Sequence, residues 1–169
     1  KAYGVEYGYM TTIHATTNDQ TTLDVAHKKG AFSRRGRSAL ENIIPASTGA
    51  ASAIGKVLPN LNGKLKGSAF RVPTIDGSVV DLTVKLGKSV TKEEINEMFK
   101  SNQSDVIKFT MDPIVSSDVI GTHAGSLVDG LLTDVLECDE EELVKVVAWY
   151  DNELGYTCQM IRTLGELLK

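Results

Sequence analysis

The sequence is poor in the residues that mark disulfide-rich, metal-binding or membrane-spanning proteins. Its 169 residues include only two cysteines, Cys138 and Cys158, too few for a disulfide framework or a cysteine-ligated metal site. No apolar run approaches the roughly 20 residues of a membrane-spanning helix, so we expect no membrane contact. No G-x-G-x-x-G pattern follows a strand, which excludes a dinucleotide-binding domain from this sequence.

Positive charge is also in deficit. Lysine and arginine total 18 against 22 acidic residues, a net charge of −4, which argues against broad affinity for nucleic acid. Hydrophobic residues make up 41% and charged residues 24%, which is ordinary globular composition. We therefore expect a single domain spanning residues 1–169. Reduced thiols and the lack of a targeting segment favour the cytoplasm.

The chain has no initiator methionine. It opens at Lys1 and enters β-type sequence within two residues. We interpret it as a piece excised from a longer chain.

The periodicity of apolar residues predicts more strands than helices. Strands are expected at Tyr3–Ile13, Ala69–Val72, Val80–Leu86, Ile114–Ile120, Ser126–Leu136 and Leu143–Tyr150. Helices are expected at Thr48–Leu58, capped by Thr48 and stopped by Pro59, after the capping box Thr91–Glu94, and at about Asn152–Leu168. Strand follows strand in the second half, which is an α+β pattern with a mixed, mostly antiparallel sheet covered by helices.

Four sequence blocks carry most of the functional information. The first, residues 9–20, reads YMTTIHATTNDQ and ends an apolar, β-branched run at a histidine followed by a polar loop. The others are IIPASTGAA at 43–51, FRVPT at 70–74 and WYDNE at 149–153. Together they resemble the catalytic domain of the phosphorylating glyceraldehyde-3-phosphate dehydrogenase family from end to end. The resemblance implies that domain's fold, with the Rossmann domain absent.

His14 is the catalytic candidate. A histidine at a strand end is more often a hydrogen-bonded structural residue, and nearby threonines could satisfy it. An imidazole also titrates near neutrality, so it can take a proton as a base and return it as an acid. The resemblance implies the second role, because the family's histidine in this block faces the nucleophilic cysteine and helps to form its thiolate.

Arg71 is the leading phosphate ligand. An arginine in an apolar segment should be partly buried, where it needs an anion or an ion pair, and its planar fork suits a phosphate. The structural alternative is an ion pair with Asp19 or Asp81. By resemblance, Thr17 helps to hold the phosphate of the substrate. Asp19 alone would repel that phosphate, so we expect it to pair with an arginine beside the site.

Two further anion contacts lie between residues 28 and 49. Thr48 and Gly49 open a predicted helix, whose free N–H groups favour an anion. By resemblance, this turn takes the attacking inorganic phosphate. Arg37 closes a basic segment that would otherwise be read as a solvated face. The resemblance implies an S-shaped loop that reaches the neighbouring subunit, with Arg37 approaching the phosphate site.

The last block supplies the cofactor contacts. Asn152 could merely cap the final helix, but the resemblance implies that it holds the carboxamide of the nicotinamide of NAD. It also implies that Tyr156 lies close to the same ring.

Neither cysteine is a good nucleophile. Cys138 lies among acidic residues, which disfavour its thiolate, and Cys158 lies on an apolar helical stripe. By resemblance, the parent protein is a glycolytic oxidoreductase that converts glyceraldehyde-3-phosphate, NAD and inorganic phosphate into an acyl phosphate. Because the catalytic cysteine and the cofactor half are missing, we expect this chain alone to be inactive and not to bind NAD tightly.

The family's homotetramer contacts lie largely in this half. An assembly or interaction module is therefore one alternative function, and we expect the isolated chain to self-associate. Nucleic-acid binding through the basic loop Lys28–Arg37 is a second alternative, which the acidic net charge disfavours.

Overall fold

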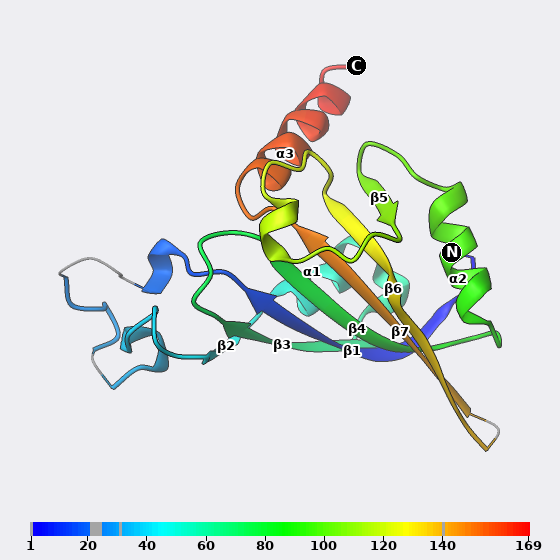
Figure 1. Ribbon diagram of the computed structural model, residues 1–169, viewed down its shortest axis with the longest axis horizontal. Coiled ribbons are helices and arrows are strands. Elements are labelled where there is room, and N and C mark those ends of the chain that lie inside the picture. Colours follow the sequence, from blue (N-terminus) through cyan, green and yellow to red (C-terminus); the bar gives the residue numbers. More distant parts are fainter. Residues whose placement is uncertain (1, 21–24, 31, 140) are drawn as a thin grey trace.

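The computed structural model describes residues 2–20, 25–30, 32–139 and 141–169. Within these residues a seven-stranded sheet in the order β2-β3-β1-β4-β7-β6-β5 forms the centre of the molecule (Figure 1). Its strands are β1 (Val5–His14), β2 (Ile44–Ser47), β3 (Leu65–Arg71), β4 (Ser78–Leu86), β5 (Ile107–Thr110), β6 (Ser126–Cys138) and β7 (Glu141–Tyr150). The α-helices are α1 (Ala50–Val57), α2 (Lys92–Ser101) and α3 (Leu154–Leu167).

The sheet is mixed. β1 pairs in parallel with β3 and β5 in parallel with β6, while the other four neighbouring pairs are antiparallel. The predicted α+β fold with a mostly antiparallel sheet is therefore confirmed. Because parallel strands end at the same edge, this topology brings the last residues of β1 and β3 together.

The main apolar core lies between the sheet and α2. Val84 of β4 and Val144 of β7 are paired across the sheet, and Ile95 of α2 packs against both. The predicted capping box orients this helix: Thr91 Oγ1 accepts from the backbone N–H of Glu94 at 3.2 Å, and the Glu94 carboxylate accepts from that of Thr91 at 2.8 Å.

The strand predicted at Ile114–Ile120 is wrong. The segment contains a 3₁₀ helix at Ser116–Val119, with Val119 fully buried. The Asp118 carboxylate accepts from the backbone N–H of Val115 at 2.8 Å. This N–H is therefore used in a local turn and is not available to a neighbouring strand. The true edge strand, β5, is only four residues long and was not predicted.

The predicted cap of the first helix is also wrong. α1 begins at Ala50 with Gly49 as its N-cap, and Thr48 Oγ1 instead accepts from the backbone N–H of Ala50 at 3.2 Å. The cause is β2, an unpredicted edge strand that pairs with β3 as far as Ser47 and keeps the chain extended to that residue. Pro45 is tolerated there because an edge strand has one unpaired side.

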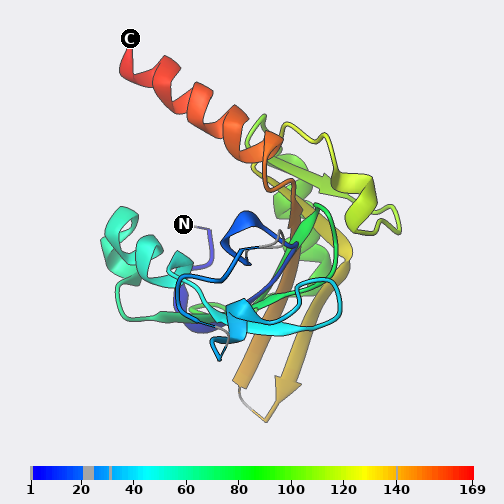
Figure 2. The same cartoon turned by 90° about the vertical axis from the view of Figure 1, so that its left-hand side faces the viewer.

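α3 projects from the sheet and carries the C-terminus at its far end (Figure 1, Figure 2). The predicted apolar stripe begins with the half-buried Leu154 and Cys158, but Ile161, Leu164 and Leu168 are exposed. None of the helices in the described part of the chain is long and apolar enough to cross a membrane.

The segment from Asn18 to Arg37, which contains the basic loop Lys28–Arg37, is only partly described. Its described portions include two 3₁₀ helices, η1 (Asn18–Gln20) and η2 (Arg34–Gly36). Residues 21–24 and Ala31 lie outside the described residues, as does Lys1 at the start of the chain.

Candidate functional site

His14 and Arg71 are direct neighbours at the ends of β1 and β3. They face each other in the parallel register, and the backbone N–H of Val72 donates to the His14 carbonyl at 2.9 Å, which carries the pairing one step beyond the strands. Both side chains are half-buried. A titratable ring and a fixed cation therefore share one end of the sheet, where loops replace the ladder.

The two side chains also touch. Nη1 of Arg71 lies 2.5 Å from Nδ1 of His14 and donates to the Ala15 carbonyl at 3.2 Å, while the same His14 Nδ1 lies 2.8 Å from that carbonyl. Nδ1 can either accept from the guanidinium or donate to the carbonyl, but not both. The first arrangement leaves the ring proton on Nε2, whereas the second leaves Nε2 with a free lone pair.

The environment of His14 favours its neutral form. Burial lowers the pKa of His14 most, and the positive charge of Arg71 lowers it further, against the opposing hydrogen bond to the Ala15 carbonyl. Burial likewise lowers the pKa of Arg71, with the charge of Arg35 acting in the same direction. An anion bound at Arg71 would offset the repulsion between Arg71 and protonated His14, and that between Arg71 and Arg35.

Tyr150, the last residue of β7, closes the other side of the imidazole. Its ring meets that of His14 edge-to-face, with centroids 6.0 Å apart and an interplanar angle of 76°. Burial raises the pKa of the Tyr150 hydroxyl, partly offset by its hydrogen bond with Ser78. The sequence alone does not distinguish Tyr150, which ends the predicted strand Leu143–Tyr150, from other strand residues.

Asn152 is tied to β4 and to the loop before it. Its Oδ1 accepts a short hydrogen bond from the Ser78 hydroxyl, and its backbone N–H donates to Asp76 Oδ1 at 3.1 Å. Ser78 also accepts from the backbone N–H of Ala15 at 3.0 Å, so it connects Asn152 to the residue that follows His14. With Oδ1 engaged, Asn152 Nδ2 has both protons available for a ligand.

In the described part of the chain, Asp19 forms an ion pair with Arg35, and not with the phosphate-site candidates Arg37 and Arg71. Its carboxylate contacts Arg35 at short range, and Lys28 lies 4.0 Å from it. Arg35 also donates to the Ser47 carbonyl at 3.3 Å. The sequence offered three arginines within four positions, and only tertiary structure distinguishes them.

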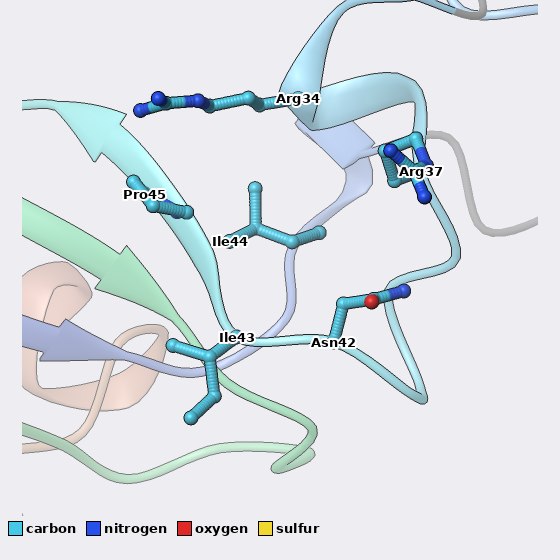
Figure 3. Close-up of a pocket in the computed structure, with 6 residues that line it drawn as sticks. All are labelled: Arg34, Arg37, Asn42, Ile43, Ile44 and Pro45. Atoms are coloured by element: carbon cyan, nitrogen blue, oxygen red, sulfur yellow. The ribbon is translucent and has the colours of Figure 1, made fainter.

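Arg37 lines a separate shallow pocket of about 150 Å³ with Arg34, Asn42, Ile43, Ile44 and Pro45 (Figure 3). Its side chain is exposed, and Figure 3 shows it across Ile44 from the guanidinium of Arg34. Among the described residues, the arginine whose charge acts on Arg71 is Arg35.

The two threonine candidates lie at different distances from His14. Thr17 lies three residues beyond it, and its backbone N–H donates to Gln20 Oε1 at 2.9 Å, which closes the turn at η1. Thr48 lies beside Gly67, which is four residues before Arg71 in β3 and therefore about 13 Å away at the spacing of a strand. His14, Arg71 and Asn152 are thus linked by contacts, whereas the Thr48–Gly49 turn is displaced along the sheet.

Tyr156 lies four residues beyond Asn152, on the first turn of α3, and Cys138 is the last residue of β6. Tyr156 is 69% exposed on α3, and Tyr150 rather than Tyr156 contacts His14. Cys138 pairs with Glu141 at the opposite end of β7 from Tyr150, about 30 Å along the strand. Among the described residues, no three histidine, cysteine or acidic side chains gather closely enough to hold a metal ion.

Residues 1–152 match the family model described as the C-terminal domain of glyceraldehyde 3-phosphate dehydrogenase. The glyceraldehyde-3-phosphate dehydrogenase of Streptococcus pyogenes is 54% identical over 168 residues, which is 99% of this chain and 50% of that protein. Those of Clostridium pasteurianum and Clostridium acetobutylicum are 54% and 52% identical over 167 residues, with the same coverage. The chain thus spans about half the length of the curated relatives that it matches. It belongs to the glyceraldehyde-3-phosphate dehydrogenase family, of which it carries the C-terminal domain.

Proposed function

We propose that this chain is the catalytic half of a cytoplasmic, NAD-dependent enzyme of glycolysis that oxidises and phosphorylates glyceraldehyde-3-phosphate. The observation that carries the proposal is the contact of His14 with Arg71, 2.5 Å apart at the ends of two parallel strands. A base and an anion ligand are thereby placed within the length of one small phosphorylated substrate.

His14 is the group that moves the proton. When a phosphate takes the guanidinium of Arg71, Nδ1 of His14 is free to donate to the Ala15 carbonyl, and Nε2 becomes the base. Nε2 then holds the proton taken from the attacking thiol and faces the substrate oxygen as it gains negative charge. The thiol itself comes from the half of the protein that precedes this domain in the family.

Arg71 and Thr17 hold the substrate phosphate, and Asp19 keeps Arg35 beside them. The ion pair of Arg35 with Asp19 supports this arrangement, because it offsets the negative charge of a carboxylate that would repel the phosphate. The Thr48–Gly49 turn receives the attacking inorganic phosphate, and its distance from Arg71 along β3 supports a second anion position rather than a shared one. Arg37 approaches the phosphate site from the other end of β2, where it lines a pocket with Ile44, the residue that pairs with Arg71.

Asn152 orients the cofactor. Its Oδ1 is occupied by Ser78, so its two Nδ2 protons fit the carbonyl oxygen of a carboxamide. NAD, when bound, supplies the acceptor for the hydride that leaves the substrate. Tyr156, exposed on the first turn of α3, lies close to the same nicotinamide ring.

A homotetrameric parent, and self-association of this chain, are supported by exposed apolar side chains on α3, including Ile161 at 61% and Leu164 at 54% exposure. The same exposure favours the chain as an assembly module when it occurs alone.

The test joins this chain to the N-terminal half of the Streptococcus pyogenes relative. We expect the chimera to reduce NAD only when glyceraldehyde-3-phosphate and inorganic phosphate are both present. We expect the chain alone not to reduce NAD under the same conditions. Turnover by the chain alone that survives replacement of Cys138 and Cys158 would overturn the missing-nucleophile argument. A folded chimera that binds NAD but never turns over would overturn the proposed activity.

A further inference from the structure

Ser78 is the most deeply buried polar residue near the site, with no measurable exposure. It is the first residue of β4 and pairs with Tyr150, the last residue of the neighbouring strand β7. Its hydroxyl accepts from the backbone N–H of Ala15 at 3.0 Å and donates to Asn152 Oδ1 over a short contact. Three segments that lie far apart in the sequence therefore meet at one oxygen.

The directions of these hydrogen bonds follow from what each group can do. A hydroxyl has one proton and two acceptor sites, and the backbone N–H of Ala15 can only donate to it. The Ser78 proton is therefore directed to a different partner, the Oδ1 atom of Asn152. The amide of Asn152 must then present oxygen to Ser78 and its NH₂ group to the other side.

A second anchor holds the same segment. Asp76 Oδ1 accepts from the backbone N–H of Gly77 at 2.6 Å and from that of Asn152 at 3.1 Å. The backbone and the side chain of Asn152 are thus held by residues two positions apart. Such double tethering leaves the amide one orientation, which packing alone does not achieve for an asparagine.

We propose that Ser78 is a positioning residue that fixes, through one hydroxyl, both the amide orientation of Asn152 and the place of the Ala15 peptide beside His14. The cofactor contact and the acid–base group are thereby set by the same side chain. This inference rests on the proposed function in assigning the cofactor contact to Asn152. The structural coupling itself is measurable without any cofactor.

The test compares Ser78→Ala with the unchanged chain by NMR. Without the hydroxyl, the buried N–H of Ala15 loses its acceptor, and the Ala15 carbonyl no longer holds Nδ1 of His14 in place. Because that carbonyl contact raises the pKa of His14, we expect its titration midpoint to move to lower pH. We also expect the side-chain NH₂ signals of Asn152 to shift.

Two matched variants separate hydrogen bonding from packing. Ser78→Cys keeps nearly the same shape but has only a weak donor and acceptor, so it should move both signals in the same direction as Ser78→Ala. It also serves if Ser78→Ala does not fold. Thr133 in β6 is 1% exposed and its hydroxyl has no partner in the described structure, so Thr133→Val should move neither signal.

In the chimera described above, we expect Ser78→Cys to raise KM for NAD by about tenfold, while KM for the aldehyde stays nearly constant. Signals of His14 and Asn152 that stay in place in a folded Ser78→Cys chain would overturn the inference. If the signals move but the chimera is inactive, the proposed function fails while the positioning role stands.

Discussion

Nη1 of Arg71 lies 2.5 Å from Nδ1 of His14, where the parallel strands β1 and β3 end. A permanent cation at that distance favours the neutral imidazole, and a hydrogen bond from it to Nδ1 leaves the ring proton on Nε2, the atom that must accept a proton as the base. The substrate phosphate would remove this hydrogen bond when it binds Arg71. Anion binding and proton transfer are thus coupled through one contact.

The first prediction follows from that coupling. Burial and then the charge of Arg71 lower the pKa of His14, so neutralising Arg71 should raise it. We expect both millimolar inorganic phosphate and the Arg71→Met substitution to move the NMR titration of His14 to higher pH. Lys145→Met, which breaks only an ion pair with Asp81 on the sheet, is the control and should have no effect. An unchanged midpoint in both cases would contradict the coupling.

The second prediction concerns Asp151, which is buried and joins α3 to the loop before β6. Its carboxylate accepts from the backbone N–H groups of Gly121, Glu153 and Leu154 at 2.7–2.8 Å. Burial raises the pKa of Asp151, but these hydrogen bonds outweigh it and hold the pKa below the usual 3.8. Because the pKa of Asp151 is lower in the folded chain, its ionised carboxylate stabilises the fold above pH 3.8. This stabilisation is lost as the pH falls through the folded pKa.

Asp151→Ala should therefore lower the free energy of unfolding by about 2 kcal/mol at pH 7. Urea titrations at pH 7 and at pH 3 measure the effect, and the difference from the unchanged chain should shrink at the lower pH. A difference that is equal at both pH values would mean that the charge of Asp151 does not contribute.

The third prediction concerns the turn that places Ser78. Gly77 has φ +81°, and a Cβ there would overlap the carbonyl of Ser116. Gly63 has a similar φ of +76° but open space around it. Gly63→Ala should lower the free energy of unfolding only by the penalty for a positive φ, about 1–2 kcal/mol. Gly77→Ala adds the overlap with Ser116 and should lower the free energy of unfolding by roughly 3 kcal/mol or more. Equal losses in chemical denaturation would show that the Ser116 contact yields without strain.

The fourth prediction concerns assembly. Ile161 and Leu164 lie on the exposed apolar stripe of α3, and each 100 Å² of apolar surface left in water forgoes about 2.5 kcal/mol. We expect sedimentation at micromolar concentration to show species above the monomer. The pair Ile161→Lys and Leu164→Lys should shift them toward monomer, whereas Thr163→Lys on the same helix should not. Association that persists in the double variant would point instead to the exposed Tyr7 and Tyr9 side of β1.

Elements with a strong local signal were predictable from the sequence. The alternation in β4 and the capping box Thr91–Glu94 depend on residues a few positions apart, and both are confirmed. The four-residue strands β2 and β5 were not predicted, because they exist only through pairing with β3 and β6. The segment Ile114–Ile120 failed for the converse reason, since its apolar residues serve a turn.

The site divides in the same way. His14 and Arg71 stand out through residue type and strand-end position, and the register brings them together. Ser78 gives no sequence signal, because a small polar residue at the start of a strand is common. The pairing of Asp19 with Arg35 and the contact of Tyr150 with His14 depend on tertiary contacts alone.

Substitution of His14 in the chimera shows whether this residue is the acid–base group of the reaction. We compare NAD reduction by His14→Asn with that by His123→Asn, which replaces an exposed histidine in the loop before β6. We expect a loss of about 10²–10⁴-fold in kcat for His14→Asn, with little change for His123→Asn. A His14→Asn chimera that keeps the unsubstituted kcat and pH profile would contradict the acid–base role of His14.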